Sequence, residues 1–399
     1  MALLLFSIII AIIGLALLLG AAYLLSNDKK NVNFKSVGIM IVLQLLMTWF
    51  LLATTVGLKI IETVANGFNK ILAYATEGID FVVGGWIPEG GSPFFVNVLL
   101  PVVFTSVLFA ILTHLRILPY TIKYVGGLLS KLTGLPRVES FNAVNSMFFG
   151  QSESLLAIRT HVEKFKGNRL FIICVSAMAS VSAALVASYM TMLPAKYVLV
   201  ACVLNIVSAL VIASIVAPVK VTGEEADIDI NDMVRSKNIF DAISNGALDG
   251  GKVALIVAAM LIGYLGILAL LNGVFDAIIG MDLTTIVGYV FAPIAYMMGI
   301  PASDIIASGS LMGMKLLSNE FVAILEFQPL MGDLSVKTVA IISTFLMSFA
   351  NFSSIGIIIG SVQAINGAKV KEVSSFGLKM LLVATMASLL SATIVGLFV

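Results

Sequence analysis

Two glutamates stand inside otherwise apolar stretches of the sequence, Glu153 in a Gly-Gln-Ser-Glu run and Glu320 in a Ser-Asn-Glu run. A carboxylate at membrane depth is costly unless it is paired, hydrated or protonated. The neighbouring Gln151, Ser152 and Asn319 supply neutral hydrogen-bonding groups rather than fixed cations. Carboxylates accept hydroxyl protons, and a glutamine side chain can pair with an amide-like edge. These residues predict a polar site for an uncharged solute that is rich in hydroxyls or amides.

A third polar cluster, Phe349-Ala350-Asn351-Phe352-Ser353-Ser354, interrupts another apolar stretch. Its amide and hydroxyls either bond to neighbouring helices or mark a place where a helix unwinds and offers its backbone to a ligand. Phe349 can give such a ligand an apolar face, or it is ordinary packing. Lys315 is the sole basic residue near either glutamate, so no cation is placed to clamp a phosphate or carboxylate.

The composition indicates an integral membrane protein. Of the 399 residues, 60% are hydrophobic and only 11% are charged, and the mean hydropathy is +1.09. Soluble domains carry about 25% charged residues, so lipid is expected to cover much of this surface. The net charge of +1 comes without a basic patch interleaved with aromatics. Nucleic acid is therefore not a predicted partner.

Enzymatic and metal-binding functions find no support in the motifs. His114 and His161 are far apart, and Cys174 and Cys202 lie in apolar stretches, which predicts neither a metal site nor a disulfide scaffold. Metalloprotease and serine-hydrolase motifs are missing from the sequence. We expect a protein that is not an enzyme and needs no cofactor.

Eight apolar stretches are long enough, at about 20 residues each, to cross a bilayer as helices. They are 3–25, 37–58, 95–115, 170–190, 197–216, 253–271, 338–360 and 378–399. The first is longer than the core of an ordinary signal peptide and has no small-residue cleavage site, so we expect a retained crossing. Lys29, Lys30 and Lys35 follow it. Because basic residues favour the cytoplasm, both termini are predicted outside.

Two further apolar stretches, 141–165 and 305–327, are interrupted by the glutamate runs. Each arm has about a dozen residues, which is too short for a hydrocarbon core of about 30 Å. Broken backbone is tolerated at membrane depth only where protein buries it or where it lines a wet cavity. The two stretches therefore predict re-entrant hairpins.

The two hairpins belong to an internal repeat. The segment from Gly134 aligns with the segment from Gly299, each with a Gly-x-Pro turn, an apolar arm and a polar tip that ends in Glu. The span after each also matches, from Ala179 in one half and from Ala350 in the other. An odd number of crossings separates the hairpins, so they enter from opposite faces. Inverted repeats with interrupted helices are typical of secondary transporters.

The same motifs resemble those of the concentrative nucleoside transporter family. The tip 150–153, the tip Asn319-Glu320-Phe321 and the segment 349–354 match its three motifs in order, and the likeness covers nearly the whole chain. The resemblance implies an all-α integral membrane protein with about eight transmembrane helices and two opposed re-entrant hairpins. It implies a homotrimer that imports nucleosides by symport, in which a transport domain moves like an elevator against a scaffold.

The family's roles carry over by motif position. The resemblance places Gln151, Ser152 and Glu153 at the nucleobase with Leu185 as an apolar neighbour, Glu320, Asn351 and Ser354 at the ribose hydroxyls, and Phe349 against the nucleoside.

One position of the family's sodium site differs in this chain. The sodium-coupled members have an Asn where this chain has Ser146, and a serine hydroxyl is a poorer sodium ligand than an amide carbonyl. The rest of that implied site lies near Phe149, Ser180 and Val181. The run FNAVNSMFFGQSE is similar to the bacterial proton-coupled branch. We expect proton symport with Glu153 or Glu320 as carrier; a sodium-coupled symporter, or a carrier of nucleobases or amino acids, is the alternative.

The expected organisation follows the repeat. Residues 1–115 form scaffold helices 1–3, and residues 116–220 form the first repeat with an interfacial helix, hairpin 1 and helices 4–5. Residues 221–280 form a cytoplasmic loop and scaffold helix 6. Residues 281–399 form the second repeat with hairpin 2 and helices 7–8. The expected location is the cytoplasmic membrane.

Overall fold

The computed structural model describes residues 2–86, 93–219 and 230–399, and within these ranges it contains helices and no strand. Residues 220–229, in the expected cytoplasmic loop, lie outside the described part. Among the described residues, seven helices are long and apolar enough to cross a membrane. The expectation of an all-α membrane protein is therefore confirmed.

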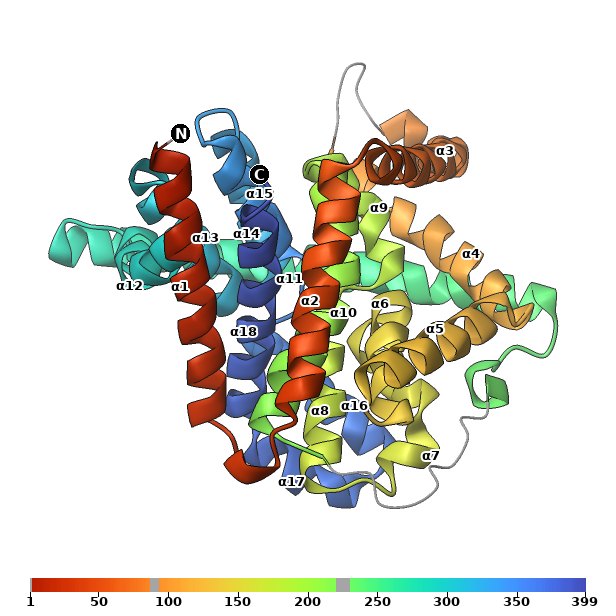
Figure 1. Ribbon diagram of the computed structural model, residues 1–399. Coiled ribbons are helices and arrows are strands. Elements are labelled where there is room, and N and C mark those ends of the chain that lie inside the picture. Colours follow the sequence, from red (N-terminus) through yellow and green to blue (C-terminus); the bar gives the residue numbers. More distant parts are fainter. Residues whose placement is uncertain (1, 87–92, 220–229) are drawn as a thin grey trace.

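Four straight helices form one side of the molecule: α1 (Ala2–Leu24), α2 (Phe34–Ala53), α10 (Ala195–Val216) and α18 (Gly377–Gly396). They run side by side in Figure 1, with both chain termini at the same end. Most of α10 and α18 is buried inside the protein, whereas most of α1 faces outward. An apolar helix with no polar face is expected in such a central position.

Two further crossings are broken in the middle. The predicted span 170–190 consists of α8 (Gly167–Met178) and α9 (Ala183–Met192), and the predicted span 338–360 consists of α15 (Val336–Leu346) and α16 (Phe352–Ile365). Asn351 caps α16, because its side-chain oxygen accepts a hydrogen bond from the Ser354 N–H. The two breaks touch, since the Phe349 N–H donates to the Ser180 carbonyl over 3.1 Å.

Both glutamate runs interrupt helices as the sequence predicts. Hairpin 1 is α6 (Arg137–Ala157), which reverses at Gly150 and is followed by α7 (Arg159–Val162). Gly150 has φ 79° and ψ −173°, a conformation that is essentially open only to glycine. Hairpin 2 consists of α13 (Ile305–Leu317) and α14 (Glu320–Phe327), and Asn319 caps α14 by accepting a hydrogen bond from the Val322 N–H.

Hairpin 2 is anchored at its open end by Asp304. The carboxylate accepts hydrogen bonds from Thr338 Oγ1 (2.6 Å), Ser303 Oγ (2.7 Å) and the Ser335 N–H (3.0 Å). Burial by itself raises the pKa of Asp304, but these donors outweigh it and hold the pKa below its ordinary value. The anchor joins the start of the hairpin to the start of α15.

The internal repeat extends to the helix before each hairpin. In the first half α5 (Ile117–Thr133) leads through Gly134 into hairpin 1, and in the second half α12 (Leu283–Met297) leads through Gly299 into hairpin 2. Both glycines have positive φ, 69° and 84°, so the two turns share a left-handed residue. Hairpin 1 lies in the lower half of Figure 1 and hairpin 2 in the upper half.

The wall opposite the hairpins is built from α4 (Pro101–His114), which follows a π-helical turn (Phe95–Leu99), and α11 (Ile239–Ile279). At 41 residues, α11 is longer than the predicted span 253–271. Gly246 and Gly250 lie one turn apart on it and let α4 approach closely, because a Cβ at Gly250 would stand 2.7 Å from the Val103 Cα.

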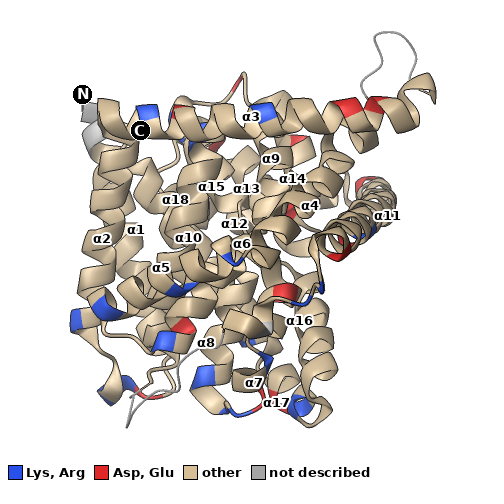
Figure 2. Cartoon of the chain, turned by 90° about the vertical axis from the view of Figure 1, so that its right-hand side faces the viewer, with Lys and Arg blue, Asp and Glu red and all other residues tan. Residues whose placement is uncertain are grey.

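The charged residues distinguish the two ends of the molecule. Lys and Arg gather at the lower end in Figure 2, around α7, α8 and α17 (Val370–Ser375). The amphipathic α3 (Thr55–Val83) crosses the upper end. This distribution is what a basic cytoplasmic face would produce.

Candidate functional site

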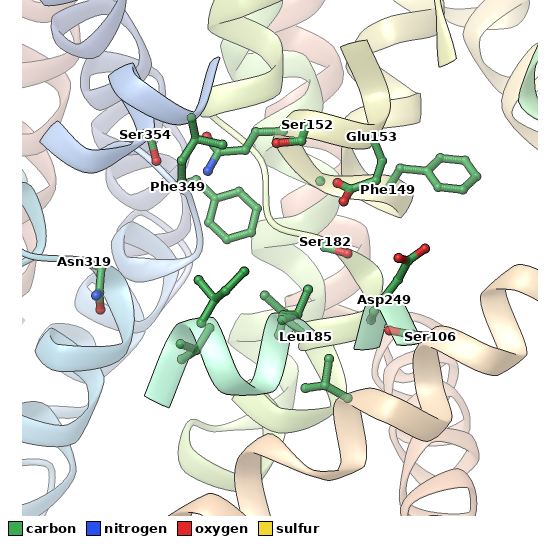
Figure 3. Close-up of a pocket in the computed structure, with 18 of the residues that line it drawn as sticks. Ser106, Phe149, Ser152, Glu153, Ser182, Leu185, Asp249, Asn319, Phe349 and Ser354 are labelled. Atoms are coloured by element: carbon green, nitrogen blue, oxygen red, sulfur yellow. The ribbon is translucent and has the colours of Figure 1, made fainter. Parts of the chain in front are cut away.

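A cavity of about 440 Å³ lies where the two hairpin tips, the two helix breaks and the α4–α11 wall meet (Figure 3). Small-molecule sites commonly have volumes of roughly 300–1,000 Å³. All eight substrate-binding residues expected from the sequence line this cavity: Gln151, Ser152, Glu153, Leu185, Glu320, Phe349, Asn351 and Ser354. Segments as far apart as residues 150 and 354 thus contribute to one site.

Glu320 is held in place on both of its oxygens. It is the first residue of α14 and only 4% exposed. The Tyr189 hydroxyl donates to Oε1 over 2.9 Å, and the Asn351 side-chain amide donates to Oε2 over 3.3 Å. The helix N-terminus also favours a negative charge here. A carboxylate has about four acceptor positions, so Glu320 can still accept hydroxyl protons from a ligand.

Glu153 lies in a different environment. Its side chain is exposed to the cavity and accepts no hydrogen bond from another side chain in the described structure. The charged groups that act on it are Asp249 of α11 and Arg235, which precedes α11. Figure 3 shows the Glu153 and Asp249 carboxylates extending toward each other from opposite walls, with Ser106 beside Asp249. Water in the cavity can reach Glu153.

Gln151 carries a hydrogen-bond acceptor that nothing satisfies. The side chain is 8% exposed, and its Oε1 has no partner in the described structure. A buried acceptor without a donor is destabilising, and a ligand N–H or O–H in the cavity would remove that penalty. Leu185 and Phe349 supply apolar surface nearby. The arrangement suits a planar ligand with a polar edge.

A second cavity of about 250 Å³ adjoins the first, since Phe149, Glu153 and Asp249 line both. It continues to Arg235 and Ser236. Glu153 therefore lies between the main cavity and a second cavity that extends toward the segment before α11.

The positions expected to form a sodium site are only partly exposed to the cavity. Phe149 lines it, but Ser146, Ser180 and Val181 are buried behind it. The Ser146 hydroxyl donates to the Asn142 carbonyl over 2.7 Å, within its own helix. No cluster of three or more His, Cys, Asp and Glu occurs in the described ranges.

Three lining or supporting residues are not expected from the sequence. Tyr189 bonds Glu320 from α9, and Ser106 and Asp249 come from the α4–α11 wall. Asp249 had the clearest signal, a carboxylate in a long apolar helix. Tyr189 is one of many aromatics in apolar segments, so its sequence context gives no hint.

Comparisons with known proteins agree with this geometry. Models of the Na+ dependent nucleoside transporter C-terminus and N-terminus match residues 197–396 and 13–86, and a nucleoside recognition model matches residues 95–196. Purine nucleoside transport protein NupG of Bacillus subtilis (strain 168) is 38% identical over 97% of this chain and 98% of its own length. Nucleoside permease NupC of Helicobacter pylori is 33% identical over 99% of this chain and 98% of its own length.

Solved structures show the same fold. The structure of CNTnw in an inward-facing substrate-bound state superposes with a TM-score of 0.93 at 31% identity, covering 98% of both chains. A variant of CNTnw in an outward-facing state superposes with a TM-score of 0.92 at 30% identity, and the match covers 98% of this chain and 97% of that chain.

Opposed hairpins and broken crossings around a cavity with polar hairpin tips define a secondary membrane carrier. With matches along nearly its full length, the chain belongs to the concentrative nucleoside transporter family. The expectations of a nucleoside carrier and of a protein that is not an enzyme are confirmed.

Proposed function

We propose that this chain imports nucleosides together with protons and that hairpin 1, hairpin 2 and the two broken helices move as one unit against α4 and α11. The observation that supports it most is the single cavity between the tips. It combines a rigidly held carboxylate at Glu320 with an unsatisfied acceptor at Gln151. A nucleoside offers hydroxyls to the first and a base edge to the second.

The proposed pose divides the nucleoside between the repeats. The base faces the hairpin 1 residues Gln151, Ser152 and Glu153, and Leu185 lies beside it. The ribose hydroxyls bind to Glu320, Asn351 and Ser354 of the second repeat. Phe349 packs against the nucleoside. The side-chain chemistry supports this division, because Glu320 can accept hydroxyl protons and Gln151 can both donate and accept. Since a 38% identical relative is named for purine nucleosides, inosine is the first substrate to test.

We assign the proton to Glu153 rather than Glu320. Glu320 already accepts hydrogen bonds from Tyr189 and Asn351, which stabilise its carboxylate in one place. Glu153 accepts none from a side chain, lines the cavity and faces the Asp249 carboxylate. A group at such a place can take up a proton on one side and release it on the other. The Ser146 hydroxyl, used within its own helix, argues against a sodium ligand there.

Uptake into proteoliposomes tests the coupling ion. Radiolabelled inosine and uridine uptake should rise when the outer medium is made acidic, and it should persist when choline replaces sodium. In Glu153→Gln, the nucleoside exchange that remains should no longer respond to acid. Strict sodium dependence would refute proton coupling. An acid response that survives in Glu153→Gln would mean that Glu320, and not Glu153, carries the proton. Competition by free bases or amino acids, if stronger than by nucleosides, would favour the alternative substrates.

Orientation and assembly complete the proposal. The basic end in Figure 2 faces the cytoplasm, which puts both termini outside the cell, and the protein resides in the cytoplasmic membrane. Residues 1–115 and scaffold helix 6, within 221–280, stay fixed in a homotrimer, and the moving parts lie within 116–220 and 281–399. Cysteine labelling at the termini of intact cells and native mass spectrometry of the purified protein test these two statements.

A further inference from the structure

Lys315 is a completely buried lysine in the last turn of α13, the first arm of hairpin 2. Its ammonium donates to the Phe345 carbonyl and to Ser348 Oγ, each over 2.6 Å, and it lies 4.2 Å from the centre of the Phe345 ring. No carboxylate is within ion-pair distance of it in the described part of the chain. All of its direct partners are thus neutral.

An ammonium in this place is costly, because hydrogen bonds to neutral partners offset only part of the hydration free energy that it loses on burial. A methionine has similar length and would fill the same space without that cost. The lysine also does not reach the cavity, whose lining does not include it. These facts point to a use for the positive charge inside the protein, away from the ligand.

The charge lies at the end of a half-helix. α15 ends at Leu346, so the Phe345 carbonyl is one of the last four, which have no partner within the helix. The C-terminal end of a helix carries a partial negative charge that a cation offsets. Ser348 lies in the unwound segment 347–351 and is itself hydrogen-bonded to Ser388 of α18 over 2.6 Å. Lys315 therefore links hairpin 2 to the break and, through Ser348, to α18.

The unwound segment 347–351 delivers two groups to the cavity, Phe349 and Asn351. Asn351 donates to Glu320, which follows Lys315 by five residues in the chain. Lys315 thus bonds to Ser348 in the segment that carries Asn351, and it belongs to the same hairpin as Glu320. The Glu320 carboxylate is also near enough for the two charges to act on each other.

The two repeats differ at this position. When Glu153 is aligned with Glu320, Phe148 takes the place of Lys315. The first repeat therefore has an apolar side chain where the second has an ammonium. The cation belongs to the half whose carboxylate accepts a hydrogen bond on each oxygen.

We propose that Lys315 is a positioning residue: its ammonium acts as a tethered cation that fixes the segment 347–351, and with it the Asn351–Glu320 pair, for the ribose hydroxyls. The proposal rests on the assignment of the ribose to these residues under the proposed function. It predicts that loss of the charge harms recognition of the sugar more than recognition of the base.

The test compares dissociation constants of the purified full chain in nanodiscs for inosine, 3′-deoxyinosine and uridine. The wild type should bind inosine about tenfold or more tightly than 3′-deoxyinosine, as expected when a charged acceptor loses a hydroxyl donor. Lys315→Met should narrow that ratio to about twofold or less, while the inosine-to-uridine ratio stays unchanged. Lys315→Arg should retain a larger ratio than Lys315→Met. Lys337→Met is the matched control, because Lys337 is a buried lysine bonded to Ser7 Oγ at the far end of α15.

The outcomes separate the two proposals. An inosine-to-3′-deoxyinosine ratio that is unchanged in Lys315→Met overturns the role of Lys315. A wild type that does not distinguish the two ligands refutes the ribose assignment itself. If Lys315→Met is not monodisperse, Ser348→Ala decides, since it keeps the lysine but removes its hydroxyl partner: a reduced ratio supports the proposal and an unchanged one overturns it.

Discussion

Replacing Glu320 by Gln keeps the size of the side chain but exchanges one acceptor oxygen for an NH2 donor and removes the charge. The wild-type carboxylate accepts from both the Tyr189 hydroxyl and the Asn351 amide. The glutamine NH2 must therefore face one of these donors. A hydrogen bond to a charged group contributes about 1.5–3 kcal/mol, so two ribose hydroxyls together lose about 3–6 kcal/mol. That corresponds to a loss of roughly 10²- to 10⁴-fold in affinity.

The assay is uptake of radiolabelled inosine and uridine into proteoliposomes at concentrations below KM, together with equilibrium binding to the purified variant. Glu326→Gln is the control, because Glu326 lies on the same helix but its side chain is exposed. Glu320→Gln should give uptake near background with a normal size-exclusion profile, and Glu326→Gln should resemble wild type. Near-normal transport by Glu320→Gln would refute the ribose assignment.

Three smaller changes test the framework around the site. Gly150→Ala adds about 1–3 kcal/mol of backbone strain and a Cβ 3.1 Å from that of Ser182, so its Tm in detergent should fall; an unchanged Tm would contradict the tip geometry. Tyr189→Phe removes one donor to Glu320 and should weaken nucleoside binding about tenfold, whereas unaltered affinity would show that this hydrogen bond is not needed. Asp304 has a lowered pKa, so its stabilisation is present above its ordinary pKa of 3.8 and is lost as the pH falls through the lower folded-state value. Asp304→Asn should therefore lower the Tm at pH 7, and the Tm difference from wild type should shrink as the pH is lowered below 3.8. Equal Tm values at pH 7 would contradict this role.

The hairpins could be predicted because each combines two strong local signals. Gly150 and the Ser318-Asn319 pair break apolar stretches that are too short to cross when divided, and a glutamate follows each break. At membrane depth, a polar tip between apolar arms is tolerated in few backbone arrangements, because its polar groups must be buried in protein or line a wet cavity. The cavity that joins the two tips follows from the repeat, since an inverted pair brings its tips to the middle.

Other parts of the fold gave weaker signals. α12 is a 15-residue apolar helix with Pro293 inside, too short to be a crossing and too apolar to resemble a surface helix. α11 extends well beyond its most apolar part because Asn238 caps it far upstream. The break in each crossing shows in the sequence only as small polar residues, which also occur in unbroken helices.

Long-range contacts were the least predictable. The Tyr189 hydroxyl meets Glu320 across 131 residues, and Lys315 meets a backbone carbonyl 30 residues away. Neither pairing leaves a local pattern, because the partner is chosen by the packing of whole helices. The sequence shows that Lys315 is near a tip but not that it turns away from the cavity.

The division of the cavity wall has a consequence for movement. Every substrate-binding residue proposed here lies on a hairpin or a broken helix, whereas α4 and α11 face the cavity mainly with side chains such as Val102, Val253 and Met260. A nucleoside bound in the proposed pose keeps its hydrogen bonds while the hairpins and broken helices move, because the residues that make these bonds move with it. Apart from Ser106 and Asp249, the wall formed by α4 and α11 offers an apolar surface, so few polar contacts have to break as the binding site moves past it.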